Sequence, residues 1–324
     1  MSEINSIEIG KGSYGKVYKL DMNGRKVALK KSFEEVDSSV LISFTREILI
    51  MSLLSHPNIL NCLDFKIRKE GLELYTPWQP YSLKDFIQSY NYSGILCVPN
   101  HIICNFLLDI LQGLNFLHYN NIIHGDISED NILISSNYRC LIADFGLSQL
   151  EYSEQEKVIK EENLNSKASL MEEVFKNPYS SPEVLEGNKY YNSFSDIWAF
   201  GVLIMRFFSN KYFFGNESCR KQQLKNVNLY LDLSNDMKNV YMSRFINPKT
   251  IDMDGIFFSD EISYTYIEVI NEIFIRSINN RPTAKMLIKK IDYFESIFKR
   301  INSYSSLSNE TSFCSHKKPL LFDF

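Results

Sequence analysis

The stretch that decides the fold is His124-Gly125-Asp126-Ile127-Ser128-Glu129-Asp130-Asn131-Ile132-Leu133, followed after a short gap by Asp144-Phe145-Gly146. Asp126 and Asn131 lie in one tight loop, where a carboxylate can accept the proton of a hydroxyl group and an amide oxygen can bind a divalent cation. Asp144 adds a second hard oxygen ligand. Mg²⁺ on a nucleotide takes one or two protein carboxylates together with phosphate and water oxygens, which is the ligand set offered here. Three unrelated residues that cap turns are the alternative interpretation.

A glycine-rich motif lies near the N-terminus, Gly10-Lys11-Gly12-Ser13-Tyr14-Gly15-Lys16-Val17, in a strand–turn–strand pattern. Glycines let the backbone approach phosphates closely, and the free N–H groups of such a loop can point at oxygens. Alone, the motif fits a dinucleotide-binding turn or an ordinary hairpin equally well. The dinucleotide-binding turn needs a helix directly after the loop, whereas here a strand and then Val27-Ala28-Leu29-Lys30 follow. This order of elements favours a lid over nucleotide phosphates.

Lys30 lies in that apolar strand, where a buried ammonium group is costly unless a carboxylate pairs with it. A helix is expected over residues 40–54, and Glu47 lies on it at helical spacing from the apolar Phe44 and Met51. Glu47 therefore faces inward. The alternative is a solvent-facing lysine and a surface glutamate, the usual state of both residue types. The sequence predicts a buried Lys30–Glu47 ion pair.

The remaining pattern predicts a small β-rich part followed by a larger, mainly helical part. Strands are expected within 6–35, at 59–65 and at 72–75, and helices at 40–54, from 83, and at 102–119, 195–209, 264–274 and 284–298. Residues 151–173 contain seven acidic residues and three lysines and are typical of a loop. The expected division is 1–77, 78–300 and a flexible polar tail at 301–324.

Composition excludes several classes of protein. The 324 residues are 44% hydrophobic and 23% charged, as in globular proteins, and 35 basic against 39 acidic residues lack the excess of a nucleic-acid binder. The six cysteines are scattered without a C-x-x-C pair, which indicates neither a zinc site nor a disulfide framework. No secretory signal and no apolar stretch close to the ~20 residues of a membrane span are found. We expect no nucleic-acid or membrane partner and a cytoplasmic location, with the nucleus as a second compartment.

In this order, the motifs resemble those of eukaryotic-type protein kinases over roughly residues 4–298. The resemblance implies an α+β bilobal fold, ATP and Mg²⁺ as cofactors, and serine or threonine hydroxyls of protein substrates as phosphate acceptors. It implies that Lys30 holds the α- and β-phosphates with Glu47 as its partner, that Asp126 orients the hydroxyl and accepts its proton, and that Asn131 and Asp144 bind the metal. The implied ATP-binding positions are Ile9, Gly10, Lys11, Gly12, Ser13, Tyr14, Gly15, Val17, Ala28, Lys30, Thr76 and Leu133.

Further matches lie along the C-terminal half. Ser181-Pro182-Glu183 resembles the A-P-E that closes the activation segment of the family, and Arg281 resembles the buried ion-pair partner of its glutamate. Asp196 resembles the aspartate that braces the catalytic loop. The residues that match the stacked regulatory spine of the family are Met51, Cys62, His124 and Phe145. His124-Gly125-Asp126 is also similar to small-molecule and atypical kinases, but those lack an A-P-E, so the Glu183/Arg281 pair argues against them.

Gly125 departs from the family, which has an arginine there that pairs with a phosphorylated activation loop. A phosphate within the acidic run 151–173 would meet repulsion and no arginine at Gly125. We therefore expect activity that does not depend on phosphorylation of this segment. The alternative is that a basic cluster elsewhere, Arg46 with Arg139 or Lys176, replaces the missing arginine.

Two more departures concern the phosphate-transfer region. Ser128 stands where serine/threonine kinases carry a lysine, and Lys176 where they carry a threonine. Lys176 could substitute for the missing lysine at the γ-phosphate, or it could point to solvent. These departures leave two interpretations, an active serine/threonine kinase and a pseudokinase that acts as an ATP-binding scaffold. The alanine/arginine pattern of tyrosine kinases is absent.

The motifs Val27-Ala28-Leu29-Lys30-Lys31, Arg46-Glu47-Ile48 and His56-Pro57-Asn58-Ile59 resemble those of cyclin-dependent and related kinases. A regulatory protein partner is expected on this basis. Against this subgroup, its arginine just before the A-P-E is Ser180 here.

Overall fold

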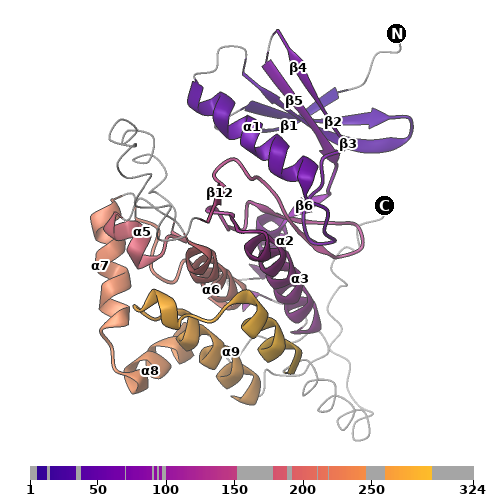
Figure 1. Cartoon of the computed structure of the whole chain (residues 1–324). Helices are drawn as coiled ribbons and strands as arrows, with labels where there is room; N and C mark the ends of the chain where they lie inside the picture. The colour runs from indigo at the N-terminus through magenta and orange to yellow at the C-terminus, as the bar shows by residue number, and fades with distance from the viewer. Residues whose placement is uncertain are drawn as a thin grey trace, which may run out of the picture.

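The computed structural model describes residues 6–12, 15–33, 38–69, 71–89, 91–92, 95–96, 100–151, 178–187, 192–209, 211–217, 219–245 and 260–293. A β-sheet with one helix across it lies above a larger helical body (Figure 1). The two-lobed α+β fold that the motifs predict is confirmed.

The small lobe is one antiparallel sheet and one helix. Its strands are β1 (Ser6–Gly12), β2 (Gly15–Met22), β3 (Arg25–Ser32), β4 (Asp64–Arg68) and β5 (Gly71–Pro77), in the order β1-β2-β3-β5-β4, and its helix is α1 (Ser38–Leu53). Gly15 begins β2 where a Cβ atom would collide with the carbonyl of Lys31 on β3. The last glycine of the glycine-rich motif is therefore required by the close approach of two strands.

The strand expected at 59–65 is wrong in its first half. The structure begins β4 only at Asp64, and Ile59 and Leu60 instead lie buried beside Ile142 of the large lobe. The backbone N–H of Leu60 donates to the carbonyl of Ile142 at 2.9 Å. These residues are apolar because they cross the core between the lobes, and that burial imitates the pattern of a strand.

The large lobe is mainly helical. In chain order its elements are β6 (Tyr81–Ser82), α2 (Leu83–Ser89), β7 (Asn91–Tyr92), β8 (Ile95–Leu96), α3 (Asn100–Tyr119), β9 (Ile122–Ile123), β10 (Ile132–Ile134), β11 (Cys140–Ile142), β12 (Gln149–Leu150), α5 (Pro182–Glu186), α6 (Ser193–Ser209), α7 (Arg220–Leu231), α8 (Asn235–Phe245), α9 (Asp260–Ile273), the 3₁₀ helix η3 (Ile278–Asn280) and helical residues 284–293. Helix α6 lies at the centre of this lobe and contacts α3, α8 and α9. Its Trp198, Phe200 and Phe207 are fully buried, as the nearly all-apolar pattern predicts.

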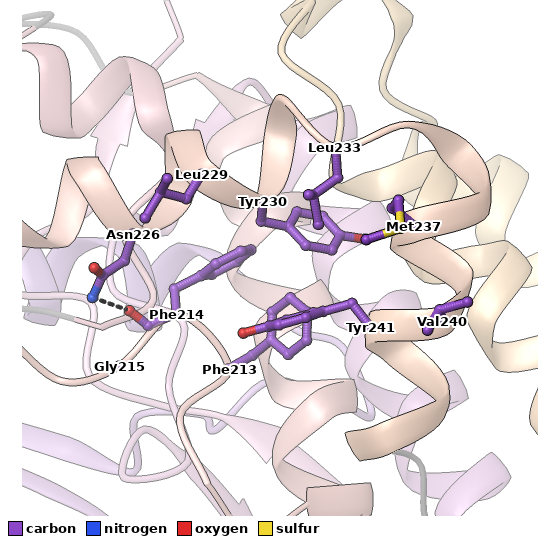
Figure 2. A pocket seen from close by; sticks show the side chains of 10 residues that line it. All are labelled: Phe213, Phe214, Gly215, Asn226, Leu229, Tyr230, Leu233, Met237, Val240 and Tyr241. Carbon is purple, nitrogen blue, oxygen red and sulfur yellow. Dashed lines mark hydrogen bonds between the residues drawn. The ribbon is translucent and has the colours of Figure 1, made fainter.

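Helices α7 and α8 were not predicted, because neither carries a strong apolar stripe. In α7 only Gln223, Val227 and Tyr230 are buried. The contacts that attach them come from the preceding loop, where Phe213 and Phe214 pack against Tyr230 with ring centroids 5.1 and 5.7 Å away. Figure 2 shows these rings around a cavity of about 470 Å³ between that loop, α7 and α8.

Helix α3 contains a longer apolar segment than the sequence analysis expected. Among the described residues, Ile102–Tyr119 is the one segment long and apolar enough to cross a membrane, with a mean hydropathy of 1.2 over 18 residues. In the structure 61% of this segment is buried inside the protein. Its apolar character is explained by its place in the core, beside α6 and β11.

Candidate active site

The predicted ion pair between Lys30 and Glu47 forms where β3 faces α1. The Nζ of Lys30 lies 2.6 Å from Oε2 of Glu47 and 3.3 Å from Oδ1 of Asp144. Glu47 is 4% exposed, so α1 presents it to the interior as its helical spacing predicts. The arrangement joins the sheet, α1 and the Asp144-Phe145-Gly146 turn through one ammonium group.

The protonation states of this cluster follow from its burial and charges. Burial alone would lower the pKa of Lys30, but Glu47 and Asp144 outweigh it, so the pKa is raised and the ammonium stays charged. Burial raises the pKa of Glu47 to about 7 against the opposing effect of Lys30. Burial acts in the same direction on Asp144, but there the charge and hydrogen bond of Lys30 prevail and its pKa is lowered. Asp144 is thus an anion at neutral pH.

Asp144 is held in a turn that leaves its carboxylate accessible. Its backbone has φ 62°, in the left-handed region that aspartate tolerates better than most residues, and its side chain is 40% exposed. The next residue, Phe145, is fully buried with its ring 5.1 Å from the ring of His124, edge to face. Two of the residues expected to stack as a spine are therefore in contact, and the backbone N–H of Cys62 lies 3.4 Å from the carbonyl of Met51.

The catalytic loop fixes Asp126 and Asn131 to each other. The side-chain amide of Asn131 donates to the backbone carbonyl of Asp126 at 2.8 Å and to its Oδ2 at 2.7 Å. Both N–H bonds of the amide are thus used, and its Oδ1 is the atom left to act as a ligand. The backbone N–H of Ala143, just before Asp144, donates to the carbonyl of Asn131 at 2.9 Å. The loop and the Asp144 turn are therefore adjacent, with an amide oxygen and a carboxylate for a cation.

Helix α6 braces the start of this loop. Asp196 accepts hydrogen bonds from the backbone N–H groups of His124 and Gly125, each at 2.9 Å, and its Oδ2 also lies 2.9 Å from Nε2 of His118. Asp196 is 2% exposed. The role that its match to the kinase family implies is confirmed in its geometry.

The far end of the loop has a second brace, which the sequence motifs do not reveal. Glu129 is 1% exposed and accepts from Nε of Arg206 on α6 at 2.6 Å and from Nη2 at 3.0 Å. Tyr212 adds a hydroxyl at 3.3 Å. The sequence signal is a lone arginine in an otherwise apolar helix, which needs a buried acid as its partner.

The backbone conformation at position 125 favours glycine, which comparison with the family pattern does not reveal. Its φ is +78°, and a Cβ atom there would lie 3.1 Å from the carbonyl oxygen of Leu147. Left-handed backbone beside a carbonyl suits glycine and strains other residues. The loss of the family's arginine thus accompanies a tight approach between the catalytic loop and the residues after Gly146.

Two of the three substitutes suggested for that arginine, Arg46 and Arg139, have hydrogen-bond partners within the described residues. Arg139 donates to both carboxylate oxygens of Asp109, and Nη1 of Arg46 donates to the carbonyl of Gly146 at 3.0 Å. Ser128 is neutral and 7% exposed, so the position where the family has a lysine offers no cation. Lys176, most of the acidic run at 151–173 and the tail at 301–324 lie outside the described residues.

The Glu183–Arg281 pair forms as predicted. Nη1 and Nη2 of Arg281 each lie 2.7 Å from one carboxylate oxygen of Glu183, and both side chains are buried. Burial would raise the pKa of Glu183, but Arg281 outweighs it and holds that pKa below its usual value. The pair joins α5, which contains Glu183, to Arg281 just after η3.

The described ATP-binding candidates lie on β1, β2, β3 and β5 of the small lobe and on β10 of the large lobe. Ala28 pairs with Thr76 between β3 and β5, and Val17 on β2 pairs with Lys30. Leu133 lies on β10 in the large lobe and pairs with Leu141 of β11 and Ser82 of β6. Of the glycine-rich motif, β1 holds Ile9, Gly10, Lys11 and Gly12, while Ser13 and Tyr14 lie outside the described residues. Thr76 is 7% exposed, and Ile9 is exposed on its strand.

The donor set fits a nucleotide-bound Mg²⁺. Among the described residues no group of three or more His, Cys, Asp and Glu side chains could hold a metal ion. Mg²⁺ on a nucleotide does not need one, because phosphate and water oxygens complete its shell. The carboxylate of Asp144 and the Oδ1 of Asn131 are the oxygens that such an ion would use.

Comparison with known proteins places the chain. The protein kinase domain model matches residues 4–294. The serine/threonine-protein kinase SSN3 of Phaeosphaeria nodorum is 27% identical over 227 residues, which is 68% of this chain and 49% of that protein. The chain thus spans about half the length of this curated relative. Together with the geometry above, these matches show that the chain belongs to the protein kinase family.

Proposed function

We propose that this chain is an ATP-dependent serine/threonine protein kinase. The observation that carries the proposal is the connected set Lys30, Glu47, Asp126, Asn131 and Asp144, which the fold brings together from both lobes with the hydrogen bonds of an aligned site. The similarity to a serine/threonine-protein kinase supports the acceptor class.

The residues have separate tasks in this proposal. Lys30 binds phosphate oxygens of ATP, and the chain's own carboxylates keep it charged and oriented. Asp126, held by Asn131, accepts a hydrogen bond from the acceptor hydroxyl and takes its proton. Asp144 and Asn131 would hold Mg²⁺, which when bound neutralises charge on the transferred phosphoryl group. Val17, Ala28, Thr76 and Leu133 would enclose the adenine.

The test is transfer of labelled γ-phosphate to a generic protein substrate rich in serine and threonine, with Asp126→Asn as the matched control. Loss of the positioned base should reduce the rate by about 10²–10⁴-fold. Asparagine keeps the shape of the side chain, so ATP-induced thermal stabilisation should persist. Equal labelling by both proteins would reject the proposal and favour an ATP-binding scaffold.

A regulatory protein partner belongs to the same proposal. Its support is the outer face of α1, where Ile42, Leu49 and Leu53 are 49%, 55% and 81% exposed. Apolar side chains on the open face of a surface helix are typical of a binding face. The double substitution Leu49→Glu/Leu53→Glu should leave transfer by the isolated chain unchanged and remove a protein that co-purifies with the wild type from its own cells. Retention of that protein would contradict this placement.

A further inference from the structure

Helix α1 contacts the Asp144-Phe145-Gly146 turn at a point separate from the Lys30 ion pair. The hydroxyl of Ser43 donates to the carbonyl oxygen of Gly146 at 2.6 Å, and Nη1 of Arg46 donates to the same oxygen at 3.0 Å. Ser43 is 6% exposed, and Gly146 is buried. Both lone pairs of one carbonyl are thus satisfied by two donors from one helix, which we call the Gly146 contact.

The spacing of the donors explains why they act together. Ser43, Arg46 and Glu47 lie at positions i, i+3 and i+4 of α1, so the three side chains share one face of the helix. Glu47 binds Lys30, Lys30 binds Asp144, and Gly146 of the same turn binds Ser43 and Arg46. The chain of contacts therefore leaves α1 and returns to it.

This closed set has a mechanical consequence. The Lys30 ammonium alone is a single charge between two carboxylates, and such a charge tolerates many separations of α1 from the turn. The Gly146 contact fixes that separation with two directed hydrogen bonds beside the ion pair. The N–H of Gly146 lies 3.4 Å from Oδ1 of Asp144, so both backbone polar groups of Gly146 have hydrogen-bond partners.

We infer that Ser43 and Arg46 are positioning residues that hold α1 and the Asp144 turn in the aligned arrangement from within the chain. Their catalytic effect acts through Glu47 and Asp144, so for activity this inference rests on the proposed function. The aligned arrangement then needs no phosphate on the segment after Gly146, consistent with the glycine at position 125. In this arrangement Arg46 donates a hydrogen bond to the backbone carbonyl of Gly146.

The test compares amide hydrogen exchange of the nucleotide-free full chain in the wild type, Ser43→Ala, Arg46→Met and the double variant. Thr45→Ala is the matched control, because Thr45 lies on the same helix with its side chain exposed. In the double variant, exchange in α1 and at residues 143–147 should rise by about tenfold, as expected for the loss of two hydrogen bonds to one group. Exchange in α6 should stay at the wild-type rate.

Two results would overturn the inference. The first is α1 exchange in the double variant within about twofold of the wild type. The second is faster exchange throughout the protein, including α6, which would make the contact a general stabiliser of the fold. Ser43→Thr, which retains the hydroxyl, should return α1 exchange toward the wild-type rate if hydrogen bonding is the cause, and failure to do so would contradict it.

Kinetics provides a separate measurement. The double variant should lower kcat by about tenfold and weaken activation by Mg²⁺, with KM for the protein substrate unchanged, because Glu47 and Asp144 are misplaced while Asp126 keeps its position. A wild-type chain that transfers no phosphate would refute the proposed function, while the exchange result would still decide the Gly146 contact.

Discussion

The two sides of the catalytic loop are built differently. On the nucleotide side, Lys30, Glu47 and Asp144 match the kinase family in residue type and in contacts, and one ammonium group links both lobes. On the α6 side, Gly125 departs from the family, and a buried Glu129–Arg206 pair braces the loop. Transfer chemistry restricts the first side to a few residue types, whereas the second needs only a rigid support, and several side chains can provide that.

Substitution of Lys30 by methionine tests the nucleotide side most directly. Methionine keeps the length and packing of the side chain but removes the charge that binds phosphate. We expect a fall in kcat of about a thousandfold, since the variant lacks the charge that binds phosphate oxygens. Lys31→Met, on the next residue of β3, is the control. Phosphate transfer at the wild-type rate by Lys30→Met would contradict the role of Lys30 in binding phosphate.

Removal of Arg206 tests the α6 side through stability. Arg206→Met leaves Glu129 buried without its partner, which should lower the free energy of unfolding by about 3–5 kcal/mol in chemical denaturation. The exposed Lys84–Asp130 pair at the same loop is the comparison, and Lys84→Met should cost about 1 kcal/mol or less. The double variant Glu129→Gln/Arg206→Met should recover part of the loss. An equal loss of unfolding free energy in Arg206→Met and Lys84→Met would show that the Glu129–Arg206 pair does not brace the loop.

The pH dependence of activity sharpens the comparison, because Glu47 on the nucleotide side has a pKa near neutrality. The pKa of Glu47 is raised to about 7, so protonation below that pH removes the charge that orients Lys30. We expect kcat to fall by about tenfold from about pH 8 to about pH 6. Glu47→Gln should have a low and nearly flat profile over this range. An unchanged acidic limb in that variant would assign the limb to another group.

Substitution of Gly125 is expected to have the smallest effect of these changes. Gly125→Ala should lower the free energy of unfolding by about 1–2 kcal/mol, because φ is +78° and Leu147 leaves little room for a Cβ atom. Gly24 has φ +76° with nothing within 4 Å of the place a Cβ atom would take, so Gly24→Ala separates backbone strain from crowding. Gly24→Ala should cost less. A Gly125→Ala protein as stable as the wild type would remove the conformational reason for this glycine.

Features that follow from residue type and from the spacing of apolar residues could be predicted from the sequence. Contacts between residues far apart in the chain could not. The buried Lys30–Glu47 pair follows from one charged residue in an apolar strand and one on an apolar helix face. The Gly146 contact does not, because the serine and arginine of α1 meet a carbonyl about a hundred residues away, at separations of 103 and 100. Helices α7 and α8 were missed for a different reason: neither carries a strong apolar stripe, because the aromatic rings that attach them belong to the loop just before α7.

Helix α6 has a consequence for how the protein is made. The loop that carries Asp126 is braced at its start by Asp196, 72 residues after His124, and at its end by Arg206, 77 residues after Glu129. A nascent chain that has not yet released α6 from the ribosome already contains Lys30, Asp126 and Asp144 but lacks both braces. Contacts of such long sequence separation form late in folding. The unfinished chain would therefore have the residues for phosphoryl transfer before it has their geometry, which delays activity until most of the large lobe has been synthesised.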